Sequence, residues 1–295
     1  MSVNTLIDLS KKLFAVAASV AVVGLLGVYK LQLFLVYPSS LNNARNVLDT
    51  PDAYDLPYDD VSLTTPDGET LHAFAIRQNA DSATYTNKTI VMLSPNAGNI
   101  GNYLPIARLF YDFGYNVFIY SYRGYGKSTG TASEKGLKLD ADTAMEFLAQ
   151  DIQFSQSSIV LYGRSLGGAV SIYLASKHPQ AIAGVVLENT FLCLPKVVPH
   201  IFPVLARFAF MLHQRWPSEE IVGSVPLHIP FLFMNGLKDE IVPPSHMQLL
   251  YELCLADVKE IHKFANGYHN DTLSQPEYWE IVHDFIKMKV NPIGH

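Results

Sequence analysis

Residues 158–170 read SIVLYGRSLGGAV, and this stretch decides the fold. Its first five residues form a short apolar run of strand length, and the residues from Leu166 onward favour a helix. The pattern G-x-S-x-G stands between them, at residues 163–167. A serine at so tight a turn adopts a strained backbone conformation, and its small neighbours leave room for the crowded backbone. The pattern therefore predicts that Ser165 is a nucleophile at the carboxyl end of a strand.

A second G-x-S-x-G occurs at residues 126–130, which read GKSTG. It also ends like a phosphate-binding loop, but Ser121 stands where a Walker motif needs a glycine. No apolar run leads directly into this second match. We therefore place Ser128 in a loop and keep Ser165 as the nucleophile.

Short apolar runs alternate with helical patterns on both sides of the Ser165 turn. Asp67-Gly68 joins the first two strand patterns as a hairpin, which makes the sheet mixed. The later alternation is typical of an α/β protein that has a mostly parallel sheet with helices on both faces. The predicted strands are 61–65, 70–76, 89–94, 115–121, 158–162, 184–187, 230–234 and 258–264, and the predicted helices are 101–113, 133–151, 166–177, 245–255 and 277–288.

Residues 191–229 break this alternation with several prolines and no clear strand pattern. An insertion of this length is uncommon and often functional, so we interpret it as a cap over the site. The segment is rich in apolar side chains. They either attach the cap to the domain, or form an acyl-binding wall or a surface that touches a bilayer. Examples are Phe191, Phe202, Phe210 and Trp216.

A nucleophilic serine needs a base, and the base needs a carboxylate that orients it. With this strand-to-helix turn the expected order along the chain is Ser, Asp, His. Asp239 follows the strand 230–234, and His269 lies in a polar turn after the last predicted strand. Both lie at the carboxyl ends of strands, where sites on such sheets assemble. Glu188 is the alternative acid. We interpret His246, His262 and His283, inside helices or a strand, as packing or surface residues.

The tetrahedral oxyanion of acyl transfer needs hydrogen-bond donors. One backbone N–H is expected from Leu166, directly after the nucleophile. The other is expected from the loop at residues 95–99, which reads PNAGN, with Asn96 as the donor.

Residues 13–29 read LFAVAASVAVVGLLGVY and carry no charge, and the apolar run continues to Tyr37. The first stretch alone covers about 25 Å as a helix, close to the thickness of the hydrocarbon core. We predict a transmembrane anchor at residues 13–37, in preference to a cleaved signal peptide or a buried core helix. Lys11 and Lys12 precede the run and favour a cytosolic N-terminus, with the rest of the chain on the lumenal or outer side of the endoplasmic reticulum or plasma membrane.

Composition limits the remaining classes of function. The chain has 295 residues, of which 49% are hydrophobic and 16% charged, so it can bury a large core. Its net charge of −6 and lack of a basic cluster disfavour nucleic acid as a partner. Cys193 and Cys254 are far apart, without metal-ligand spacing, and we expect no metal or cofactor.

Together these motifs resemble the α/β-hydrolase family, and most closely its membrane-anchored bud-emergence (Bem) branch with its animal relatives. The matching stretches are residues 96–101 (NAGNIG), 122–128 (YRGYGKS), 163–168 (GRSLGG), 238–240 (KDE) and 269–271 (HND). One departure is Ser94-Pro95, where the family usually has His-Gly. The resemblance implies a Ser-Asp-His hydrolase with a single N-terminal anchor.

Two functions are compatible with this sequence. The first is a membrane-anchored serine hydrolase that cleaves an acyl ester, thioester or amide, with a small-molecule or acylated substrate that includes lipids. The second is a catalytically idle scaffold that binds proteins at a membrane. We divide the chain into a tail (1–12), the anchor (13–37), a connecting segment (38–60) and the hydrolase domain (61–290). The sequon at residues 87–89 (NKT) predicts a glycoprotein if it faces the lumen.

Overall fold

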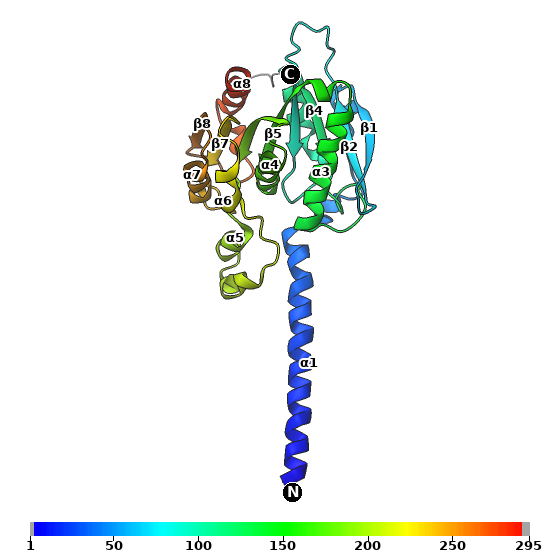
Figure 1. Ribbon diagram of the computed structural model, residues 1–295, viewed down its shortest axis with the longest axis vertical. Coiled ribbons are helices and arrows are strands. Elements are labelled where there is room, and N and C mark those ends of the chain that lie inside the picture. The colour runs from blue at the N-terminus through cyan, green and yellow to red at the C-terminus, as the bar shows by residue number, and fades with distance from the viewer. Residues whose placement is uncertain (1–2, 291–295) are drawn as a thin grey trace.

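The computed structural model describes residues 3–290, and the first two residues of the predicted tail lie outside this range (Figure 1). The elements follow the predicted alternation of strands and helices closely. The strands are β1 (Asp59–Thr64), β2 (Thr70–Ile76), β3 (Lys88–Leu93), β4 (Asn116–Tyr120), β5 (Ser158–Arg164), β6 (Ile182–Glu188), β7 (Phe231–Gly236) and β8 (Lys259–Phe264). The main helices are α1 (Val3–Val36), α2 (Leu104–Asp112), α3 (Glu134–Gln150), α4 (Leu166–Lys177), α5 (Leu194–Ile201), α6 (Ser218–Ile221), α7 (Pro244–Leu253) and α8 (Tyr278–Lys289), with the 3-10 helix η5 (Pro203–Met211).

The eight strands of the described chain form one sheet in the order β1-β2-β4-β3-β5-β6-β7-β8. The β1–β2 and β2–β4 pairs are antiparallel, and every other neighbouring pair is parallel. This confirms the mostly parallel mixed sheet, with the hairpin as its antiparallel part. The loops after β3, β5, β7 and β8 all leave from the same edge of the sheet, because the carboxyl ends of parallel strands point the same way.

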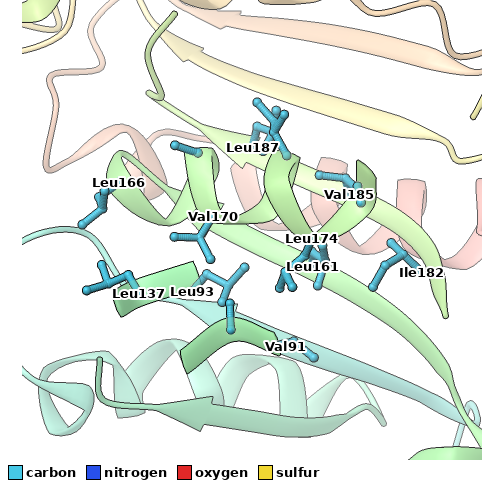
Figure 2. Close-up of a cluster of buried hydrophobic side chains, with 14 of the residues drawn as sticks. Val91, Leu93, Leu137, Leu161, Leu166, Val170, Leu174, Ile182, Val185 and Leu187 are labelled. Atoms are coloured by element: carbon cyan, nitrogen blue, oxygen red, sulfur yellow. The ribbon is translucent and has the colours of Figure 1, made fainter. Parts of the chain in front are cut away.

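Helices cover both faces of the sheet, and each face has its own hydrophobic core. On one face, alternate residues of the central strands pack against α3, α4 and α7. Figure 2 shows part of this core, where the α4 residues Leu166, Val170 and Leu174 lie among side chains of β3, β5 and β6. On the other face the intervening strand residues pack against α2 and α8. The two-residue periodicity of a strand produces both cores, because successive side chains point to opposite faces.

Local signals set several element boundaries. Ser133 caps α3, because its side chain accepts a hydrogen bond from the Gly136 N–H. Gly68 sits in the β1–β2 turn with φ of +89°, a backbone conformation that glycine adopts without strain. The predicted helix 101–113 begins instead as a short 3-10 helix at Ile100–Tyr103, where the Asn99 side chain caps the turn, and continues as α2.

Helix α1 extends away from the domain as a long rod, and the cap lies beside its domain-proximal end (Figure 1). Many apolar side chains of α1 are exposed along the rod. Among the described residues, no helix combines the length and the hydropathy that a membrane crossing requires. The transmembrane span at residues 13–37 therefore stays a prediction. In the cap, residues 191–229 contain α5, η5 and α6 and no strand.

Candidate active site

Ser165 occupies the turn between β5 and α4 in the strained conformation that the sequence predicts. Its φ is 54° and its ψ is −116°, a region that non-glycine residues rarely adopt. Hydrogen bonds hold the turn on both sides. The Ser165 N–H donates to the Glu188 carbonyl at 2.9 Å, and the Thr190 hydroxyl donates to the Ser165 carbonyl at 2.7 Å. Both bonds use backbone groups of Ser165 and not its hydroxyl.

The glycines of the G-x-S-x-G pattern are required because a side chain at either position would clash with its neighbours. A Cβ at Gly163 would lie 2.2 Å from the Ser171 hydroxyl and 2.3 Å from the Gly167 carbonyl oxygen. A Cβ at Gly167 would lie 1.9 Å from the carbonyl oxygen of Leu93, the last residue of β3. Real Cβ atoms cannot approach so closely, so α4 packs against β3 only because this position has no side chain.

Asp239 and His269 form a buried hydrogen-bonded pair, although they are 30 residues apart in the chain. Asp239 Oδ2 lies 2.8 Å from His269 Nδ1. The other carboxylate oxygen accepts two backbone N–H groups, from Ile241 at 2.9 Å and Val242 at 2.7 Å. Those two bonds fix the carboxylate plane, so Oδ2 stays aimed at the imidazole. With its Nδ1 proton donated to Asp239, the neutral ring presents Nε2 as a proton acceptor.

Ser165 and His269 line one cavity of about 730 Å³ at the carboxyl edge of the sheet. Leu166 and Asn96, the predicted oxyanion donors, line the same cavity. Leu166 is the first residue of α4, so its N–H has no partner within the helix. The Asn96 loop is held in place through the side-chain amide, which donates to the Val36 carbonyl at 3.0 Å, and through Tyr125, whose hydroxyl donates to the Asn96 carbonyl at 2.8 Å.

The alternative acid Glu188 has different partners. Its side chain is fully buried and accepts hydrogen bonds from the hydroxyls of Tyr162 and Tyr278, at 2.8 and 2.9 Å. Burial raises the pKa of the Glu188 carboxyl, against the opposing effect of the nearby Arg164 cation. Asp239, and not Glu188, is the carboxylate hydrogen-bonded to the His269 ring, and the Glu240 carboxylate accepts the His269 backbone N–H at 3.1 Å.

The other serine and histidine candidates lie apart from the cavity. Ser128 is buried in a loop, where its hydroxyl donates to the Ser121 carbonyl and accepts the His72 N–H. Burial lowers the pKa of His246 to about 4. His262 lies on β8 beside Glu260.

Three groups of cavity residues lie outside the predicted catalytic set, and in the cap only Phe191 and Phe202 were among the side chains that the sequence offered as an acyl-binding wall. Gln32, Leu35 and Val36 come from the last two turns of α1. Seven residues come from α5, η5 and the segment that follows, and the polar Arg164 and Asn270 lie beside the nucleophile, joined by a 2.9 Å hydrogen bond. The middle position of G-x-S-x-G could have suggested Arg164, because its neighbours are fixed at the site. The α1 residues carry no local signal. The cap residues at the cavity are Phe191, Leu194, Val197, Val198, Ile201, Phe202, Ala209 and Leu212.

Comparisons with known proteins identify the family of this chain. The sequence pattern of the family described as serine aminopeptidase, S33, matches residues 85–228. A membrane protein of Saccharomyces cerevisiae, YNL320W, is 51% identical over 88% of this chain and 89% of its own. Protein bem46 of Schizosaccharomyces pombe is 40% identical over 91% and 90% of the two chains. The α/β-hydrolase domain-containing protein WAV2 of Arabidopsis thaliana is 34% identical over 81% of each chain. The chain belongs to the α/β-hydrolase family.

Solved structures of an esterase and of another α/β-hydrolase have the same fold as this chain. The esterase Pf2001 of Pyrococcus furiosus superposes with a TM-score of 0.71 at 21% identity, over 84% of this chain and 97% of the esterase. An α/β-hydrolase from Vibrio vulnificus gives a TM-score of 0.70 at 19% identity, over 86% and 92%. The predicted resemblance is therefore confirmed at the level of family and fold.

Proposed function

We propose that this α/β-hydrolase is a membrane-anchored serine hydrolase that cleaves an acyl ester, thioester or amide. The observation that carries the proposal is the cavity shared by Ser165 and His269, with the His269 ring held by Asp239 at 2.8 Å. A strained serine, a buried imidazole and a fixed carboxylate are the three parts that nucleophilic acyl transfer needs. They occur in the order Ser, Asp, His, as expected on this fold.

In the proposed reaction, Ser165 Oγ attacks the acyl carbon while His269 Nε2 takes the hydroxyl proton. The backbone N–H groups of Leu166 and Asn96 stabilise the negative charge that develops on the carbonyl oxygen. His269 then gives its proton to the leaving alcohol, thiol or amine as the bond to the acyl carbon breaks. A water molecule hydrolyses the acyl-enzyme by the same route, releasing the carboxylic acid and restoring the serine. Asp239 keeps the ring oriented and stabilises its cationic form.

Labelling of the serine distinguishes this hydrolase from an idle scaffold, because only a hydrolase needs an activated serine. A fluorophosphonate probe should label the wild-type chain and the Ser128→Ala variant, and should not label Ser165→Ala. Ser128→Ala is the matched control, since it removes a serine in the same five-residue pattern. A folded wild-type chain that the probe leaves unlabelled would favour the scaffold, and labelling of Ser165→Ala would identify another nucleophile.

The anchor at residues 13–37 is supported by the charge-free sequence of residues 13–29 and by the exposed apolar side chains of α1. A relative at 51% identity carries the name of a membrane protein. Tyr29 and Lys30 would then lie at the headgroup level, where aromatic and basic residues are common. We place the hydrolase domain on the lumenal or outer side, because Lys11 and Lys12 precede the apolar run.

A further inference from the structure

The cavity of the proposed hydrolase has two ends of different chemistry. At the carboxyl ends of the strands, where Ser165 and His269 lie, it is lined by the polar residues Arg164, Asn102 and Asn270. Its other part is lined mostly by aliphatic and aromatic side chains, which come from α1, the segment 41–47 and the cap. Its volume of about 730 Å³ lies within the range of sites that enclose a ligand of drug size or larger. Such a cavity fits an amphiphile with its reactive carbonyl between a polar head and an apolar chain.

The apolar part is a fixed structure, because α1 and the cap are hydrogen-bonded to one another. The Gln32 side chain donates to the Met211 carbonyl and accepts the His213 N–H, both at 3.2 Å. The rings of Tyr29 and His213 stack with their centroids 3.9 Å apart. These contacts place η5 at the level of residues 29–32 of α1, directly after the charge-free stretch 13–29 of the proposed anchor.

A second set of contacts lies one turn closer to the domain. The Tyr37 hydroxyl donates to the Gln214 side-chain oxygen at 3.0 Å and accepts the Trp216 indole N–H at 2.9 Å. Both Tyr37 and Trp216 are buried. The end of α1 is therefore part of the wall around the cavity as well as the proposed connection to the membrane.

The outer surface of the cap is apolar where it lies beside α1. Val204 and Phe210 on η5 are 85% and 83% exposed, and neither lines the cavity. Ile201 and Phe202, at the end of α5, are also exposed. In Figure 1 this part of the cap projects beyond the sheet on the same side as the α1 rod. Exposed aromatic and aliphatic side chains in such a position are typical of surfaces that enter the lipid interface.

From these contacts we infer that the cap rests in the lipid interface through the η5 surface, and that the substrate is a bilayer lipid whose acyl chain reaches Ser165 between α1 and the cap. The inference rests on the proposed function and names its substrate class. The acyl chain occupies the apolar part of the cavity, and the alcohol portion of the lipid lies towards Arg164 and Asn270. Attack by Ser165 Oγ forms the acyl-enzyme and breaks the ester C–O bond. The leaving alcohol takes the proton from His269, and water then releases the fatty acid.

The test uses the full chain in phosphatidylcholine vesicles and two ester substrates. One is a p-nitrophenyl ester of a sixteen-carbon acid, which partitions into the bilayer, and the other is water-soluble p-nitrophenyl acetate. The variant Val204→Ser/Phe210→Ser removes the apolar surface of η5. The matched control is Ile152→Ser/Met288→Ser, because these residues are 86% and 70% exposed and lie near the amino ends of β5 and β3, away from the cap.

We expect the η5 variant to lose about tenfold in kcat/KM on the bilayer substrate, since two apolar side chains no longer enter the interface. Its activity on p-nitrophenyl acetate should stay at the wild-type level, and the control variant should match the wild type on both substrates. An equal loss on both esters, or no loss on the bilayer ester, would overturn the inference.

A second variant, Ala209→Trp, fills the apolar part of the cavity from η5. It should reduce cleavage of the sixteen-carbon ester by a factor at least about tenfold larger than its effect on the acetate ester, because an acetyl group does not reach that part. Similar losses on both esters would place the acyl chain elsewhere. Fluorophosphonate labelling of Ser165 in every variant keeps the two proposals apart. A labelled chain that cleaves acetate but shows no dependence on η5 contradicts the lipid inference alone, and an unlabelled wild-type chain contradicts the hydrolase itself.

Discussion

Replacement of Asp239 by asparagine tests the proposed triad most directly, because the structure separates the two tasks of this carboxylate. Oδ1 accepts the N–H groups of Ile241 and Val242, and Oδ2 faces His269 Nδ1. In Asp239→Asn the amide oxygen can keep both backbone bonds, so the loop should fold as before. The amide NH₂ then faces Nδ1 and donates to it. The neutral ring must in turn carry its proton on Nε2, where the serine proton would have to go.

The expected loss in kcat is about 10⁴-fold, which corresponds to about 5.5 kcal/mol of transition-state stabilisation. The assay is hydrolysis of a p-nitrophenyl ester by the purified full chain in detergent or vesicles. The melting temperature is measured in parallel, to separate misfolding from lost chemistry. Glu188→Gln is the matched control. It removes the other buried carboxylate near the site but keeps an oxygen that can accept the Tyr162 hydroxyl, so its kcat should fall by only a few-fold.

Either of two results would refute this reasoning. An Asp239→Asn chain that keeps a tenth or more of the wild-type kcat would show that the 2.8 Å contact does not set the protonation of His269. A Glu188→Gln chain that is as inactive as Asp239→Asn would transfer the role of the orienting acid to Glu188.

Three further predictions follow from the glycine contacts, the end of α1 and the sequon. Gly167→Ala should unfold about 1 to 3 kcal/mol more easily and lose fluorophosphonate labelling, because its Cβ would lie 1.9 Å from a β3 carbonyl oxygen; wild-type labelling would contradict the packing argument. A chain that begins at Pro38 lacks Tyr37 and leaves the buried Trp216 indole N–H unpaired. Its melting temperature should be about 2 to 12 °C below that of a chain that begins at Tyr29. Equal melting temperatures would count against this structural role of Tyr37. In microsomes the full chain should resist alkaline carbonate extraction and carry a glycosidase-sensitive glycan at Asn87, whereas an unmodified, protease-accessible domain would reverse the proposed topology.

The sequence predicts the parts of the fold that depend on local patterns. The apolar run, the G-x-S-x-G motif and the helix after it are consecutive in residues 158–177, and together they determine the conformation of Ser165. Asp239 and His269 are far apart in sequence, yet both directly follow predicted strands. Because parallel strands end at the same edge, their positions along the chain were enough to propose a meeting point.

The cavity wall could not be predicted in this way, because its contacts join segments without any pattern in common. Gln32 meets Met211 and His213 across about 180 residues, through ordinary amide and backbone groups. The cap side chains also divide between the two interpretations that the sequence leaves open. Trp216 is buried and joins the cap to α1, whereas Phe202 lines the cavity. Composition alone gives the two aromatic residues the same character, and only their three-dimensional positions distinguish them.

The pairing of α1 with the cap also sets an order of events during synthesis. Gln32 and the His213 backbone that it binds are separated by 181 residues. At a translation rate of 5 to 20 residues per second, about 9 to 36 s pass between the synthesis of the two partners. Helix α1 is therefore made long before the cap that it contacts. A chain still attached to the ribosome therefore holds β1 to β6 before it holds the cap, and β7, β8 and the cavity residue His269 are made after the cap. A nascent chain of this design stays without the cap side of its cavity until nearly three quarters of the chain has been made.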